Sequence, residues 1–173
     1  ADLAAGFASL PDRLDALASA LDGAMRAAAE DLARASVVFF TGLGPNLATA
    51  NFGAAKVREL CPVHAMAIPL EEIHHYRLPK RGDALVIVAT DPAARERALD
   101  TVLVGAGEGA RMIALLAGPD EDIDARVAHT VLLPALDPAL APFVASVPLH
   151  LLAYHLAHAR ERAGLGYPGL WAP

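Results

Sequence analysis

Apolar and polar positions follow two different periods along this chain, and together they predict strands that alternate with helices. Short, mostly apolar segments are typical of strands buried in a parallel sheet; they are Ser36–Thr41, His64–Ile68, Ala84–Ala89, Arg111–Ala117 and Thr130–Pro134. Longer segments repeat apolar residues at helical spacing; they are Pro11–Arg34, Leu47–Leu60, Asp91 to about Gly105, and Pro142–Arg162. Because right-handed crossovers place helices on both faces of such a sheet, we expect an α/β fold. It would be a three-layer, doubly wound sandwich with a five-stranded parallel sheet, as in flavodoxin-like folds.

The chain length and the first helix bear on domain organisation. At 173 residues the chain fits one structural domain. Within it we expect residues 1–35 to form a linker-like N-terminal helix and residues 36–173 to form the α/β unit.

Composition and charge narrow the classes of partner and compartment. The net charge is -6 and the sequence has no basic run, which argues against nucleic acid and anionic membranes as partners. The single cysteine, Cys61, excludes an internal disulfide and suits a reducing compartment. The sequence shows neither an 18-residue apolar run nor a secretory leader, so we expect a cytoplasmic location.

The loop after the first strand is the first candidate ligand site. Ligands of doubly wound folds lie beyond the carboxyl ends of the strands, where strand order reverses. Gly42, Gly44 and Asn46 form this loop, and the helix that follows can offer backbone amides to an anion. Leu47 stands where a dinucleotide fingerprint needs its third glycine, and a Walker lysine is missing. We therefore expect neither a nucleotide nor any other cofactor.

Lys56 and Glu59 are candidates for acid–base chemistry. Their i, i+3 spacing places an amine beside a carboxylate, about one helical turn apart. Lys56 is one of only two lysines among fourteen basic residues, a mild indication that a titratable amine matters there. An ordinary surface ion pair explains the spacing equally simply.

Histidines supply two further candidate clusters. Glu72 and His75 follow the second strand, so a carboxylate and an imidazole would lie near the same sheet edge, unless the segment is only a solvated loop. His155 and His158 have a spacing that could hold a metal. No cysteine or second carboxylate joins them at ligand spacing, so we predict no metal site and expect one face of their helix to meet a partner subunit.

In their order, these segments resemble the sugar isomerase (SIS) domain family, and among its members most closely the second SIS domain of glucosamine-6-phosphate synthases. Thr41–Glu59 is similar to that domain's G-x-G loop and the helix ending in K-x-x-E. His64-Ala65 and Glu72–His75 resemble its H-A and E-x-x-H motifs, and Val147–His155 its V-P-L-Q-L-L-A-Y-H helix. Leu10–Leu32 resembles the helix that joins two SIS halves.

The resemblance implies a role for each motif residue. Glu59 would move a proton between C1 and C2 of a hexose or amino-hexose phosphate, His75 would assist ring opening across a subunit interface, and Lys56 would lie beside the catalytic carboxylate. The candidate substrate-binding residues are Gly42, Gly44, Asn46, Glu72 and Thr90. The resemblance also implies a homodimer with a site near the subunit interface, or pairing with a second SIS domain.

The chain departs from the family pattern at three places. Tyr76-Arg77 replace the Gly-Pro that usually follows E-x-x-H, and the segment Tyr167–Pro173 has no lysine. Thr90-Asp91-Pro92 stand where a first SIS domain has its S-x-S-G-x-T phosphate loop. We therefore expect an incomplete site. Three functions stay open: a phosphosugar aldose–ketose isomerase or a related amino-sugar enzyme, a non-catalytic sugar-phosphate-binding regulatory module, and a structural half of a tandem SIS protein.

Overall fold

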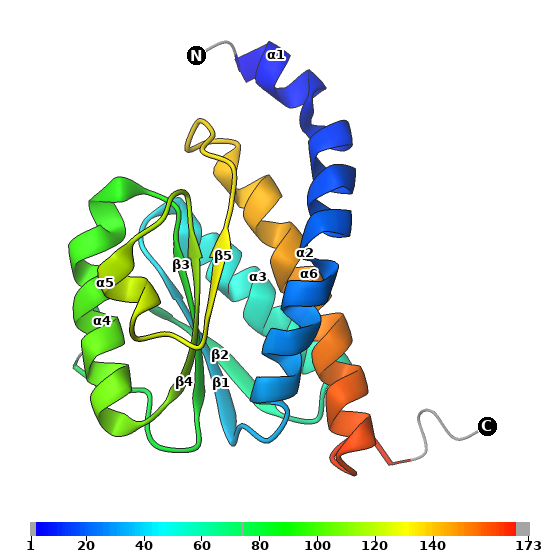
Figure 1. Cartoon of the computed structure of the whole chain (residues 1–173), viewed down its shortest axis with the longest axis vertical. Helices are drawn as coiled ribbons and strands as arrows, with labels where there is room; N and C mark the ends of the chain where they lie inside the picture. Colours follow the sequence, from blue (N-terminus) through cyan, green and yellow to red (C-terminus); the bar gives the residue numbers. More distant parts are fainter. Residues whose placement is uncertain (1–2, 74, 169–173) are drawn as a thin grey trace.

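The chain folds around a sheet of five parallel strands, seen in a computed structural model that describes residues 3–73 and 75–168 (Figure 1). The strands are β1 (Val37–Gly42), β2 (His64–Pro69), β3 (Ala84–Ala89), β4 (Arg111–Leu116) and β5 (His129–Leu132). Their order in the sheet is β2-β1-β3-β4-β5. The predicted fold class and all five predicted strands are confirmed, with strand ends that differ from the expected ones by two residues at most.

Helices cover both faces of the sheet and complete three layers (Figure 1). One face carries α2 (Leu10–Leu32), α3 (Pro45–Leu60) and α6 (Ala141–Arg162), and the other carries α4 (Arg95–Glu108) and α5 (Glu121–Asp124). The six-residue helix α1 (Leu3–Ala8) precedes α2, and a 3₁₀ turn, η1 (Pro92–Ala94), precedes α4. None of the helices that the structure describes is long and apolar enough to cross a membrane.

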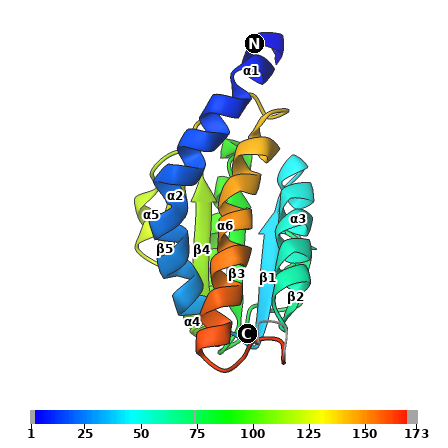
Figure 2. The same cartoon turned by 90° about the vertical axis from the view of Figure 1, so that its right-hand side faces the viewer.

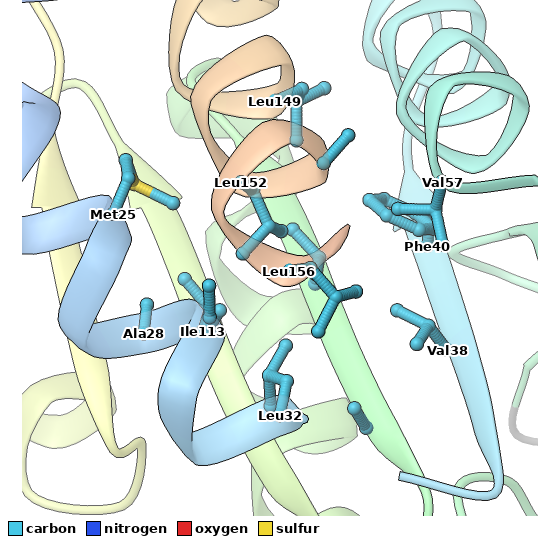
Figure 3. Packing of buried hydrophobic residues seen from close by; sticks show 14 of the residues in the cluster. Met25, Ala28, Leu32, Val38, Phe40, Val57, Ile113, Leu149, Leu152 and Leu156 are labelled. Carbon is cyan, nitrogen blue, oxygen red and sulfur yellow. The ribbon is translucent and has the colours of Figure 1, made fainter. Parts of the chain in front are cut away.

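Successive side chains along each strand point to opposite faces of the sheet, which divides the hydrophobic core into two parts. Val38 and Phe40 face the α2–α3–α6 layer, whereas Phe39 between them faces the α4 side. Leu149, Leu152 and Leu156 descend one side of α6 and fill the space above the sheet (Figure 3). A continuous apolar sequence is therefore required of the central strands, because both of their faces are buried.

The N-terminal helix takes part in this core. Met25, Ala28 and Leu32 of α2 are almost fully buried. On α6, the imidazole of His155 lies 2.8 Å from a carboxylate oxygen of Asp22, and buried Arg160 donates to the backbone oxygen of Ala33 at 2.9 Å. The second half of α2 is thus packed into the helical layer. That residues 1–35 act as a linker stays a prediction.

The strand order locates the point where the winding of the sheet reverses. The chain leaves β1 to one side for β2, and then crosses to β3, β4 and β5 on the other. The crevice between the carboxyl ends of β1 and β3 is therefore the expected ligand position. Helix α3 begins at this carboxyl edge and runs back, against the direction of the strands, to the amino edge where β2 starts (Figure 2).

Candidate functional site

Two glycines shape the loop between β1 and α3. A Cβ on Gly42 would lie 2.5 Å from the backbone oxygen of Asn46, so only glycine lets the helix start so close to the strand. Gly44, at the N-cap of α3, has φ 56° and ψ −128°, a backbone conformation that residues with a Cβ rarely adopt. The structure thus gives both predicted binding glycines a role in shaping the loop. Their contact with a substrate stays a prediction.

Asn46 and Thr90 meet across the crevice between β1 and β3. The Thr90 hydroxyl donates a hydrogen bond of 3.0 Å to Oδ1 of Asn46. Asn46 is only 3% exposed, which holds its amide in place at the carboxyl edge. The sequence predicted both residues as substrate-binding, and the structure brings them together at the point where strand order reverses.

Beside this pair lies a cavity of about 500 Å³ at the carboxyl ends of β3 and β4. Its walls are mostly apolar, with polar groups from the η1 and α5 turns; they include Ala89, Thr90, Asp91, Arg95, Ala117 and Leu136. A smaller hollow between Asn46, Pro138 and Ala141 adjoins it and shares Thr90 and Asp91. The volume lies in the range of small-molecule sites.

The charged groups around the cavity already take part in hydrogen bonds or ion pairs within the chain. Asp91 caps η1, since one of its oxygens accepts from the backbone N–H of Ala93 at 2.9 Å. Nitrogen atoms of Arg95 lie 2.5 Å from Asp120 and 2.8 Å from Asp122. These hydrogen bonds raise the pKa of the guanidinium, and the one with Asp120 has the larger effect. Burial raises the pKa of Asp120, but hydrogen bonds from Arg95 and from the N–H of Ile123 more than offset this and hold it below its ordinary value. Two carboxylates thus bind the one guanidinium, and Asp91 adds a further negative charge to the cavity wall.

Lys56 and Glu59 form the predicted pair at the far end of α3. Their Nζ and Oε2 atoms lie 2.6 Å apart, and the Glu59 side chain is 57% exposed. The Lys56 ammonium also lies 5.5 Å from the centre of the Phe52 ring. Since a helix rises about 1.5 Å per residue, Glu59 lies roughly 20 Å along the axis from the start of α3. Within one chain, therefore, the pair is not joined to Asn46 and Thr90.

Glu72 and His75 lie on the loop that follows β2. Both are exposed, while Ile73 between them is fully buried and anchors the loop against the sheet. The N–H of Leu70 donates to the backbone oxygen of Gly42 at 3.1 Å, which ties this loop to the carboxyl edge. The full length of β2 consequently separates His75 from Glu59. His74, quoted in the same motif, lies outside the described residues, as does the end of the predicted tail after residue 168.

The histidines of α6 divide between an outer and an inner face. The outer face carries an exposed row of His150, Tyr154 and His158. The His150 ring packs edge to face against the Phe52 ring, with the two ring centres 4.7 Å apart. His155 instead faces inward and hydrogen-bonds Asp22, which lowers the pKa of that carboxyl. Among the residues that the structure describes, no group of three His, Cys, Asp or Glu side chains is placed to hold a metal ion.

Sequence reasoning missed several residues of the cavity wall. Arg95, Asp120 and Leu136 come from three segments that meet only in the folded chain. The one available signal was Asp120, which precedes a short acidic run and acts as the N-cap of α5 by accepting from the N–H groups of Asp122 and Ile123.

Comparisons with known proteins agree with this architecture. The model of the SIS domain family matches residues 31–160. The glutamine–fructose-6-phosphate aminotransferases (isomerizing) of Thermococcus kodakarensis and Symbiobacterium thermophilum are 33% identical over 139 residues and 32% identical over 160 residues. These matches cover 79% and 91% of this chain but only 23% and 26% of the relatives, so the chain spans about a quarter of their length.

Solved structures show the same fold. The C-terminal domain of glucosamine-fructose-6-phosphate aminotransferase from Francisella tularensis superposes with a TM-score of 0.72 at 26% identity, over 87% of this chain and 44% of that one. The tagatose-6-phosphate ketose/aldose isomerase of Escherichia coli gives a TM-score of 0.74 at 21% identity, over 87% and 43% of the two chains. Together with the matched family model, these likenesses show that the chain belongs to the SIS domain family.

Proposed function

We propose that this SIS domain contributes Lys56 and Glu59 to a phosphosugar isomerase-type site that is completed by a second SIS domain, and that its His75 serves such a site across a subunit interface. The second domain would hold the sugar phosphate at its own carboxyl edge. It would be either another copy of this chain in a homodimer or a further SIS domain of a longer protein. The names of the relatives, a fructose-6-phosphate aminotransferase and a ketose/aldose isomerase among them, support a sugar phosphate as the ligand.

The observation that carries this proposal is the distance between the two groups of candidate residues. The Asn46–Thr90 pair lies at the carboxyl edge, whereas the Lys56–Glu59 pair lies at the other end of α3. A hexose phosphate is far shorter than the helix that separates them. One molecule can touch both groups only if they come from different domains.

The exposed pair suits proton transfer on a ligand that another domain presents. Aldose–ketose isomerisation needs one base that carries a proton between neighbouring carbons through an enediol. The Glu59 carboxylate is accessible, and its hydrogen bond to the Lys56 ammonium fixes its orientation. His75 is exposed on its loop, at the other end of β2 from Glu59, so it would act as acid or base at the ring and carbonyl oxygens of a ligand held across a subunit interface.

Isomerisation kinetics with a matched control test the proposal. The interconversion of fructose-6-phosphate and glucose-6-phosphate, and the turnover of glucosamine-6-phosphate, would be measured for the full chain, alone and mixed with an SIS domain that carries the phosphate loop. Glu59→Gln and His75→Ala should each lower kcat by at least about a hundredfold, as expected for loss of a general base or acid. Glu30→Gln is the control, because Glu30 is equally exposed and forms its own ion pair with Arg162 at 3.0 Å, between two other helices. Turnover that is unchanged in Glu59→Gln contradicts the assignment.

A non-catalytic phosphosugar-binding module is the second candidate. It is favoured by the segment Tyr167–Pro173, which has no lysine where the resembled synthases have a catalytic one. Calorimetry separates the two candidates, since binding of a sugar phosphate without turnover supports the module. If neither binding nor turnover is detected, the chain is better explained as a purely structural half of a tandem SIS protein. The fully buried, free Cys61 agrees with the cytoplasmic location that we also propose.

A further inference from the structure

The cavity at the carboxyl ends of β3 and β4 has properties that a phosphate-binding pocket would not have. Its volume of about 500 Å³ is enough for a hexose, and its walls include Ala89, Leu116, Ala117 and Leu136. Apolar walls of this kind suit the C–H face of a ring. The cavity lies roughly 20 Å from Glu59 by the length of α3, so it is separate from the proposed catalytic pair.

The hydrogen-bonding groups of the cavity are mainly acceptors. Thr90 has already donated its hydroxyl proton to Asn46, which leaves the oxygen to accept from a ligand. Asp91 uses one carboxylate oxygen to cap η1 and keeps the other. The guanidinium of Arg95 is held by Asp120 and Asp122, so its charge is already neutralised by neighbours.

We propose that this cavity binds a small polyhydroxylated amine without a phosphate group. An ammonium group would lie at Asp91, hydroxyl groups would donate to Thr90, and the apolar ring face would contact Ala117 and Leu136. A phosphate would meet the carboxylates of Asp91 and Asp120, while the guanidinium of Arg95 is already bound by two carboxylates. The N–H groups of η1 that could hold a phosphate already donate to Asp91. It follows that a second copy of this chain could not supply the phosphate pocket of the proposed catalytic site, which selects a different SIS domain as the partner.

Calorimetry with matched sugars tests the proposal on the full chain. Glucosamine, glucose and glucose-6-phosphate have the same ring and differ in charge. Glucosamine should bind at millimolar concentrations about five- to tenfold more tightly than glucose, as expected for one partly exposed ion pair. Glucose-6-phosphate should bind at least about tenfold more weakly than glucosamine, because like charges are brought together.

Two variants and a control assign any binding to the cavity. Asp91→Asn retains a capping side chain and should abolish the preference for glucosamine over glucose. Ala117→Phe should fill the cavity and remove binding of both sugars, while Asp100→Asn changes an exposed carboxylate on α4 that pairs with Arg97 outside the cavity and should change nothing. Glucose-6-phosphate binding as tightly as glucosamine and lost in Ala117→Phe overturns the proposal, and so does the absence of glucosamine binding. The catalytic proposal fails separately, through unchanged turnover in Glu59→Gln.

Discussion

Gly53 sets the distance between α3 and the sheet, and its replacement by alanine offers a quantitative test of the fold. It faces the core from the middle of α3, and a Cβ there would lie 2.7 Å and 2.9 Å from two ring carbons of Phe40. The same Cβ would lie 3.1 Å from Cδ1 of Leu149 on α6. Phe40 is fully buried on β1, so its ring has no free space to move into.

Two opposing contributions determine the expected size of the effect. Alanine is favoured over glycine inside a helix by about 1 kcal/mol. Overpacking of a tight core costs about 1–3 kcal/mol, and the closeness of two rigid neighbours places this site in the upper part of that range. We therefore expect Gly53→Ala to lower the free energy of unfolding by about 1–2 kcal/mol.

Gly23 provides the matched control, because it lies inside α2 and a Cβ added to it would have nothing within 4 Å. Gly23→Ala should raise the free energy of unfolding by about 0.5–1 kcal/mol. Urea denaturation followed by circular dichroism measures both variants, with equal m-values as the condition for comparison. If Gly53→Ala stabilises the chain as much as Gly23→Ala, then α3 does not pack against Phe40 of β1 as closely as the structure shows. In a Phe40→Leu background the cost of Gly53→Ala should shrink, because the clashing ring is gone.

Other predictions concern buried and paired groups. Arg160 donates to the backbone oxygens of Ala33, Ala35 and Pro62, so Arg160→Met should lower the free energy of unfolding by about 2–4 kcal/mol in the same denaturation experiment. If Arg160→Met destabilises the chain less than Arg26→Met, which changes a surface arginine, these hydrogen bonds do not stabilise the fold. Burial raises the pKa of Cys61 to about 11, so its reaction with a disulfide reagent near neutral pH should be at least about a hundredfold slower in the folded chain than in denaturant, and equal rates would show that the thiol is accessible. The pKa of Asp120 is lowered, so its contribution to stability is present above the unfolded carboxyl pKa and is lost as the pH falls through the folded one. The difference in Tm between wild type and Asp120→Asn should accordingly shrink on acidification below about pH 4, and a constant difference would argue against the Arg95–Asp120 pair.

The strands could be predicted from the sequence because both faces of each central strand are buried. Ala84–Ala89 is buried at every position, and this segment was the clearest apolar run of the chain. The four-residue helix α5 was not predicted, since four residues contain too little periodicity to distinguish a helix from a polar loop. Its N-cap, Asp120, was visible only as one of several acidic residues.

The position of Asn46 and Thr90 in the fold could be predicted from the sequence, but the arrangement of the cavity around them could not. Asn46 and Thr90 were placed correctly at the carboxyl edge, because the loops after parallel strands meet there. The cavity beside them depends on the return of the Leu136 segment over β3 and β4, a long-range contact without a local signature. The separation of Glu59 from the carboxyl edge, by contrast, follows from the βαβ topology, since a crossover helix must run back to the start of the next strand.

The direction of α3 links the catalytic proposal to the binding proposal. One rigid helix carries Asn46 in its first turn and Glu59 in its last, and Gly53 fixes that helix against β1 at its middle. A ligand bound at the carboxyl edge of this chain therefore cannot be reached by this chain's Glu59, whatever the ligand is. Because the acidic surroundings of the cavity disfavour phosphate, the sugar phosphate that Glu59 would act on has to be held by an SIS domain with a different loop after its third strand. The chain would then serve two ligands at once, with a sugar phosphate at its amino edge, shared with the second domain, and an uncharged or cationic sugar in its own cavity.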